Sequence, residues 1–199
     1  PRERPPAPAG SLSMAESWSV PSITRALLPI LLALTALELV GGLTLGSLEV
    51  TLLQYPTLLV LVPVMIGTAG NLGSILSARM STAFHLGLLS FDPTDEKLLG
   101  NTITTVLLAV SVFPAVGAGG WAIVAVTGDP QLSVWRVVAV ALASGLILAV
   151  LAIVVTVVAT YTAYRAELDP DDVVIPVVTN VCDVLGVLVL FAVVRLLVP

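Results

Sequence analysis

The sequence predicts an all-α integral membrane protein with five transmembrane helices, the second of them interrupted by proline and glycine. Of its 199 residues, 57% are hydrophobic and 11% are charged, whereas charged residues make up ~25% of a typical soluble domain. The mean hydropathy is +1.08. The apolar residues gather in five stretches. Each stretch is long enough to cross a bilayer, because ~20 apolar residues of α-helix span ~30 Å of hydrocarbon.

Residues 1–20 differ from the rest of the chain. They are rich in proline, serine and charge and lack the apolar core of a secretory signal, so we interpret them as a disordered tail. Residues 21–199 are expected to form one five-helix transmembrane domain. The net charge is −5 and no basic run is present, which argues against nucleic-acid binding. The single cysteine, Cys182, excludes an internal disulfide and a cysteine-based metal cluster.

The first span, from about Ile23 to Gly46, contains an acid, Glu38. Acidic side chains inside membrane spans are usually functional, since a charge near the bilayer centre costs ~2.5–3.5 kcal/mol on insertion scales. The alternative is an interfacial glutamate on a helix that ends early, at Gly41-Gly42. Glu49 is expected to be solvated in the following loop.

The second span starts near Tyr55 and changes character after Pro63. Its second half is small and polar, with three glycines around one amide: Gly67, Gly70, Asn71 and Gly73. We expect an interrupted helix here, and interrupted helices often carry the ion or substrate site of transporters. Close helix packing through small residues four apart explains Gly70 and Ser74 equally well.

The third and fourth spans show no ligand pattern. The third, Ile103–Val126, contains Pro114 and three glycines, which predict a kink and tight packing. The fourth, Val134–Tyr161, is built of valine, alanine and leucine and is expected to be a scaffold helix.

The fifth span, Val173–Val198, carries Asp183 near its middle with no basic residue beside it. Thr179 and Asn180 lie four and three residues earlier, which places both on the aspartate's side of a helix. Pro176, one turn earlier, frees a backbone carbonyl. Oxygen-only ligation suits a hard cation such as Mg²⁺ or Ca²⁺.

Basic residues predict the orientation. With the N-terminus inside, six basic residues lie on the inner side and two, Arg136 and Arg195, on the outer side. We therefore expect a multi-pass protein of the cytoplasmic membrane with its N-terminus in the cytoplasm. In this orientation Glu38 would lie nearer the outer mouth than Asp183.

Two segments resemble a known family. The segment PVMIGTAGNLGSILSARMSTAFHLG is similar to the second-helix motif of MgtE-type magnesium transporters, and LDPDDVVIPVVTNVCDVLG is similar to the motif that enters their fifth helix. The first segment is closer to the duplicated solute-carrier relatives of animals, although this chain carries a single copy. The resemblance implies a dimer whose central ion pathway is lined by the second and fifth helices. It maps the key aspartate onto Asp183 and the Gly-Asn pair onto Gly70-Asn71.

The chain also departs from the bacterial members. We expect it to lack their cytoplasmic regulatory domains and therefore to use another mode of gating. The bacterial second-helix motif continues with an Asn-Gln pair, where this chain has Ser74-Ile75. A single copy is expected to pair with itself or with a sibling chain.

Residues and resemblance together predict a channel or transporter for Mg²⁺ or another divalent cation. The expected ion ligands are Asp183, Asn180, Thr179, Asn71, Gly70 and Glu38. No cofactor is expected besides the transported cation. Two Asp183 carboxylates facing each other in a dimer would repel unless a cation lies between them. The chain has no HExxH, paired-aspartate or Ser/His/Asp set, so we do not expect an enzyme. The alternatives are a transporter of another substrate and a non-conducting subunit that assembles with a sibling chain.

Overall fold

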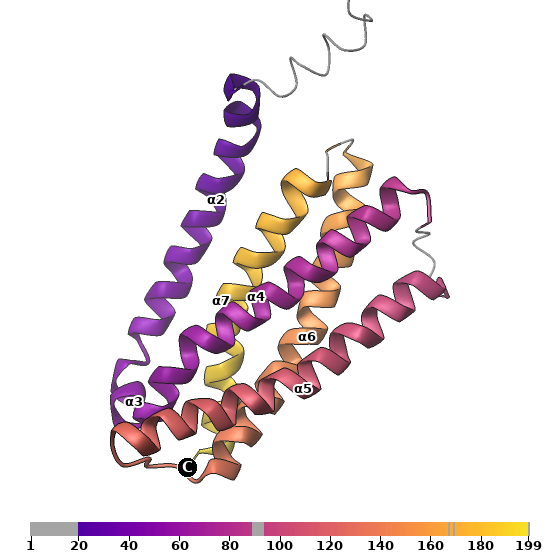
Figure 1. The fold of residues 1–199 in the computed structure, drawn as a ribbon. Helices are drawn as coiled ribbons and strands as arrows, with labels where there is room; N and C mark the ends of the chain where they lie inside the picture. The colour runs from indigo at the N-terminus through magenta and orange to yellow at the C-terminus, as the bar shows by residue number, and fades with distance from the viewer. Residues whose placement is uncertain (1–19, 89–93, 167, 169, 199) are drawn as a thin grey trace, which may run out of the picture.

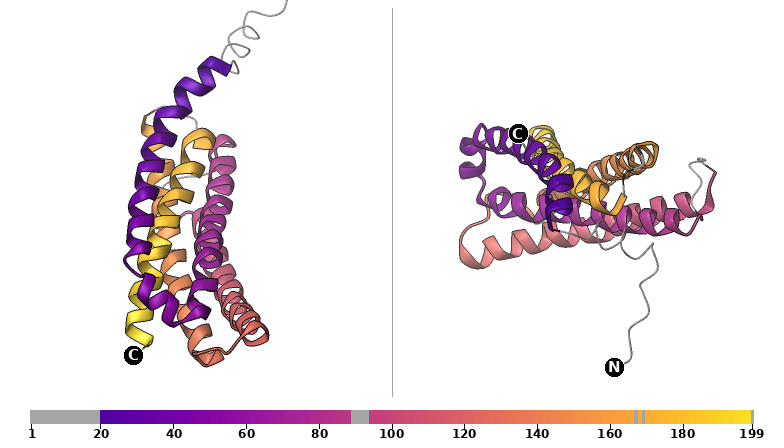
Figure 2. Two further views of the ribbon diagram at one scale, coloured as in Figure 1. Left: turned by 90° about the vertical axis from the view of Figure 1, so that its left-hand side faces the viewer. Right: turned by 90° about the horizontal axis from the view of Figure 1, so that it is seen from above.

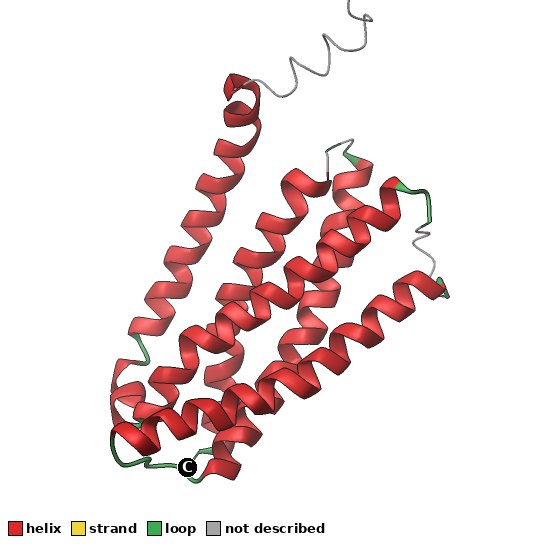
Figure 3. Ribbon diagram, in the orientation of Figure 1, coloured by secondary structure: helices red, strands yellow, loops and turns green. Residues whose placement is uncertain are grey.

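The computed structural model describes residues 20–88, 94–166, 168 and 170–198, and this part of the chain contains helices and no strand (Figure 3). The helices are α2 (Val20–Gly46), α3 (Glu49–Gln54), α4 (Pro56–His85), α5 (Glu96–Thr127), α6 (Val134–Arg165) and α7 (Pro170–Leu197) (Figure 1). The expected N-terminal tail lies outside the described residues, except for Val20.

Five of these helices are long and apolar enough to cross a membrane, which confirms the predicted fold class. The third membrane helix, α5, begins at Glu96, seven residues before the expected start. Asp95 accounts for the difference, because its Oδ1 accepts hydrogen bonds from the backbone N–H groups of Lys97 and Leu98, at 2.8 and 3.0 Å. A side chain that satisfies the first N–H groups in this way starts a helix.

The second membrane helix is continuous, so the predicted interruption is wrong. α4 runs from Pro56 to His85 without a break, although Pro63 lies inside it. Proline removes one backbone donor, and the remaining bonds carry the helix through, as they do at the prolines inside α2, α5 and α7. The glycines allow close contact instead. A Cβ atom placed on Gly73 would lie 2.5 Å from Cγ1 of Val178 on α7.

Helices α4, α5, α6 and α7 form the body of the bundle, and α2 lies at its edge (Figures 1 and 2). The most extensive packing joins α4 to α7, α5 to α6 and α6 to α7, while α2 packs mainly against α7. The first turns of α2 extend beyond the ends of the other helices (Figure 2). Most α2 side chains are therefore exposed in a single chain.

The ring of Phe113 packs α5 closely against Gly145 of α6. Phe113 of α5 is fully buried, and its ring fills the place that a side chain on Gly145 of α6 would occupy. One turn further along α5, a Cβ atom on Gly117 would lie 2.8 Å from Cβ of Ala141. The tight packing expected near Pro114 is present.

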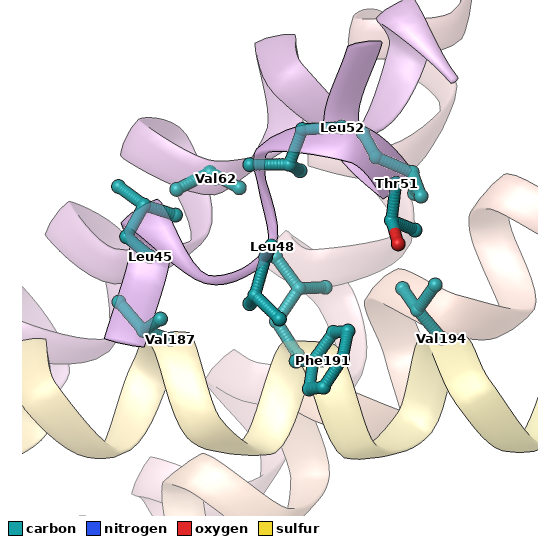
Figure 4. Close-up of a pocket in the computed structure, with 10 residues that line it drawn as sticks. Leu45, Leu48, Thr51, Leu52, Val62, Val187, Phe191 and Val194 are labelled. Atoms are coloured by element: carbon teal, nitrogen blue, oxygen red, sulfur yellow. The ribbon is translucent and has the colours of Figure 1, made fainter. Parts of the chain in front are cut away.

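The loop expected after the first span contains the short helix α3, with Glu49 exposed in its first turn. Beneath α3 lies an apolar cavity of about 20 Å³, bordered by Leu48, Leu52 and Phe191 among others (Figure 4). Such a cavity has room for about one water and offers it few polar partners. The described residues of its lining offer no set of oxygen ligands for an ion.

Candidate ion site

Asp183 lies halfway along α7, with thirteen residues of the helix before it and fourteen after it. Its side chain is half-buried and faces the crossing with α4. The residue of α4 at that crossing is Gly70. A Cβ atom on Gly70 would lie 2.9 Å from Oδ1 of Asp183 and 3.3 Å from Cγ2 of Thr179. The structure thus brings together Gly70, Thr179 and Asp183, three of the residues that the sequence singled out.

Thr179 links α7 to α4 through a pair of hydroxyl groups. Its Oγ1 donates to the carbonyl of Ile175 at 2.9 Å and lies 2.8 Å from Oγ of Ser74. Ser74 in turn donates to the carbonyl of Gly70 at 2.9 Å. Two hydroxyl groups carry two protons, so only two of these three contacts can be hydrogen bonds at one time.

Asn180 is also half-buried on α7, and its Nδ2 donates to the carbonyl of Pro176 at 2.8 Å. This bond directs the amide nitrogen to the backbone and leaves Oδ1 as an available acceptor. Asn71 follows Gly70 on α4 but is exposed, and it does not line the groove that contains Asp183. A single chain therefore does not unite all the expected ligands.

Glu38 and Asp183 line one open groove of about 250 Å³ between α2, α4 and α7. The other lining residues are glycine or aliphatic. One turn after Glu38, Gly41 packs on α7, where its Cβ position lies 3.2 Å from Cγ2 of Val184. This close approach brings the α2 backbone against α7 and holds both acids at the same groove.

The pairing of Gly41 with Val184 also sets the depth of the two acids. α2 and α7 run in the same direction (Figure 1), and this pairing places Glu38 level with the turn that contains Asp183. The expectation that Glu38 lies nearer the outer mouth is therefore wrong. The error arises because counting residues along one span gives no information about the axial position of that helix relative to another helix.

Among the described residues, neither Glu38 nor Asp183 forms an ion pair with a basic side chain. The structure shows no hydrogen bond or ion pair between Asp183 and another described residue. Within the same described part, no three His, Cys, Asp or Glu side chains gather as a closed metal site. The groove therefore holds two carboxylates, with hydroxyl and amide oxygens next to them on α7. An open set of hard oxygen ligands suits a divalent cation that keeps much of its water.

Sequence reasoning missed two features of this region, the Ser74–Thr179 contact and the groove shared by Glu38 and Asp183. A signal for the first was present, because Ser74 lies one turn after Gly70 on the face that meets α7. The shared groove depends on how α2 packs against α7, and no local sequence pattern predicts that packing.

The family model of the MgtE divalent cation transporters matches residues 62–193 of the chain. The chain belongs to this family. The match covers most of α4, all of α5 and α6, and α7 as far as residue 193, so it includes Asp183 and the Gly70-Asn71 pair. Glu38 lies before the matched region. A search of curated protein sequences found no match. MgtE proteins are membrane transporters and not an enzyme family, in agreement with the five membrane helices.

Proposed function

We propose that this MgtE protein carries Mg²⁺ across the cytoplasmic membrane through a site centred on Asp183. The observation that supports the proposal most is the groove in which Asp183 and Glu38 lie together, half-way through the bundle. Two carboxylates at membrane depth without a cationic partner are costly. A divalent cation neutralises both charges, whereas a monovalent cation neutralises only one.

The chemistry of the groove favours a hydrated ion. Mg²⁺ requires six ligands in near-octahedral geometry and gives up its water reluctantly. Asp183, Glu38 and the oxygens of Thr179 and Asn180 offer too few inner ligands to replace that water. We infer that the groove recognises the charge and the water shell of the ion.

A second copy of the chain would complete the pathway. The groove is open on one side, and next to it Asn71 and Gly67 of α4 are exposed, with open space around the Cβ position of Gly67. A partner's α4 and α7 placed against this face would cover the polar stripe and bring two Asp183 side chains toward one ion. A sibling chain with the same face would serve equally.

The orientation with the N-terminus in the cytoplasm belongs to the same proposal. The start of α2, the end of α4 and the end of α6 lie at one end of the bundle (Figure 1). Among the described residues, this end carries Arg25, Arg79, Lys97 and Arg165, and the opposite end carries Arg136 and Arg195. Loops rich in arginine and lysine remain in the cytoplasm.

Two measurements test the proposal. The protein should restore growth at limiting Mg²⁺ to a host that lacks its own Mg²⁺ transport, and the purified protein should admit Mg²⁺ into liposomes. Flux of another divalent ion without Mg²⁺ flux would show that the transported ion is not Mg²⁺. An absence of flux from the purified chain, restored by co-expression of a sibling chain, would identify a subunit.

A further inference from the structure

A second polar region lies away from Asp183, where α4 ends and α5 begins. A groove of about 380 Å³ separates these two helix ends. Arg79 and Lys97 line it with Thr82 and Asn101, and aliphatic side chains that include Leu86 complete its wall. The groove therefore combines two cations with an apolar surface.

Arg79 is held in place by a buried amide. Its Nε donates to Oδ1 of Asn101 at 2.6 Å, and Nδ2 of Asn101 donates to the carbonyl of Lys97 at 2.9 Å. Asn101 is only 8% exposed. The bond from Nε fixes the plane of the guanidinium group and leaves the four N–H bonds of its two terminal nitrogens for a ligand. Such a planar fork matches the oxygens of a phosphate group.

Among the described residues that line the groove, Arg79 and Lys97 carry charge and no carboxylate is present. Within the described ranges, neither Arg79 nor Lys97 forms an ion pair with a carboxylate. The neighbouring acids Asp95 and Glu96 do not line the groove, and Oδ1 of Asp95 accepts bonds from the first N–H groups of α5. The groove consequently favours a ligand with negative charge.

The depth of the groove identifies the kind of anion. Arg79 lies about nine residues past the middle of α4, which is ~13 Å at 1.5 Å per residue, and half of a ~30 Å hydrocarbon core is ~15 Å. Lys97 is the second residue of α5 and lies further out. The two cations therefore bracket the level at which lipid phosphates lie, and the aliphatic wall continues toward the acyl chains.

We infer that this groove binds the phosphate group of an anionic phospholipid. The Arg79 fork and the Lys97 ammonium hold the phosphate, while Ala83 and Leu86 contact the start of an acyl chain. A basic groove at a helix end suits such a headgroup, because basic side chains near the membrane surface attract anionic lipids. This site is separate from the proposed Mg²⁺ pathway and does not depend on it.

The experiment is a lipid titration of the purified protein in neutral detergent, with bound lipid counted by native mass spectrometry. Phosphatidylglycerol should bind at least fivefold more tightly than phosphatidylcholine with the same acyl chains. Lys97→Gln should weaken phosphatidylglycerol binding about fivefold, the equivalent of ~1 kcal/mol, and leave phosphatidylcholine binding unchanged. Arg79→Lys, which keeps the charge but loses the fork, should weaken it less than Arg79→Gln.

Arg165→Gln is the matched control, because Arg165 is an exposed cation at the same end of the bundle that does not line the groove. It should leave lipid binding unchanged. Equal affinity for the two lipids, or an equal loss in Arg165→Gln and Lys97→Gln, would overturn the inference. Displacement of phosphatidylglycerol by millimolar inorganic phosphate would identify a free anion as the ligand instead. Among the described residues, the Lys97 side chain forms no hydrogen bond, so its variant tests the site even if an Arg79 variant fails to fold.

Discussion

Gly70 on α4 leaves the space in which the carboxylate of Asp183 on α7 lies. A Cβ atom on residue 70 would approach Oδ1 of Asp183 to 2.9 Å. Helix packing within a bundle is dense. The absence of a side chain on Gly70 therefore determines where the Asp183 carboxylate can lie. The position of the Asp183 carboxylate can therefore be tested by a substitution at Gly70 on α4.

Gly70→Ala should reduce Mg²⁺ flux at least tenfold in liposomes, because the new methyl group displaces the Asp183 carboxylate and crowds Thr179. Overpacking of this kind also lowers the free energy of unfolding by ~1–3 kcal/mol. Gly119→Ala is the control, since Gly119 is exposed on α5 with no atom within 4 Å of its Cβ position. Equal flux from the two variants would show that the Gly70 contact does not shape the site.

Asp183→Asn should reduce Mg²⁺ flux to the level of empty liposomes while the protein still folds and inserts. The substitution keeps the shape of the side chain and removes a charge that is costly at membrane depth. Flux is measured beside Asp129→Asn, which changes an exposed acid in the turn between α5 and α6. Normal transport by Asp183→Asn at limiting Mg²⁺ would refute the proposed site.

Glu38→Gln should weaken the apparent Mg²⁺ affinity about threefold to tenfold without abolishing transport. Glu38 shares the groove with Asp183 but is the more exposed acid, so water solvates it in part. Flux is measured against Mg²⁺ concentration, with Glu49→Gln of α3 as an acid outside the groove. An unchanged curve would assign Glu38 to the membrane interface, and a complete loss would make it the principal acid.

Ser74→Ala should lower the thermal stability of the purified protein by the equivalent of ~1 kcal/mol, the usual net value of one hydrogen bond. The variant removes the contact between Ser74 and Thr179 that joins α4 to α7. Ser111→Ala removes a hydroxyl group that bonds only to carbonyls of its own helix, and it should change stability less. If both variants melt alike, the Ser74–Thr179 contact does not hold the helices together.

The proposed dimer is tested by cross-linking in membranes. In a Cys182→Ala background, Asn180→Cys should form a cross-link between two chains, because Asn180 lies on the α7 face next to Asp183. Val150→Cys places a thiol on the exposed side of α6 and should not cross-link. A strictly monomeric particle with full transport activity would exclude a pathway shared between chains.

Much of this architecture was predictable from the sequence, because hydropathy and helix length are local properties. The five spans follow from apolar stretches, and the mid-membrane position of Asp183 follows from counting residues along the last of them. Turn spacing also placed Thr179 on the aspartate's face, where it contacts α4. Asn71 shows the limit of such reasoning, since its neighbour Gly70 meets Asp183 while Asn71 remains exposed.

The sequence by itself determined a membrane protein of five helices with an acid at mid-membrane. Only the tertiary structure decided that α4 is unbroken, that Glu38 shares the groove of Asp183, and that Ser74 joins Thr179. The reason is physical. Each span follows from the cost of moving its own residues into lipid, whereas the faces that meet depend on the shapes of side chains far apart in the chain. In a sequence, a glycine that interrupts a helix cannot be distinguished from a glycine that allows a close helix contact. The position of the neighbouring helix decides between the two.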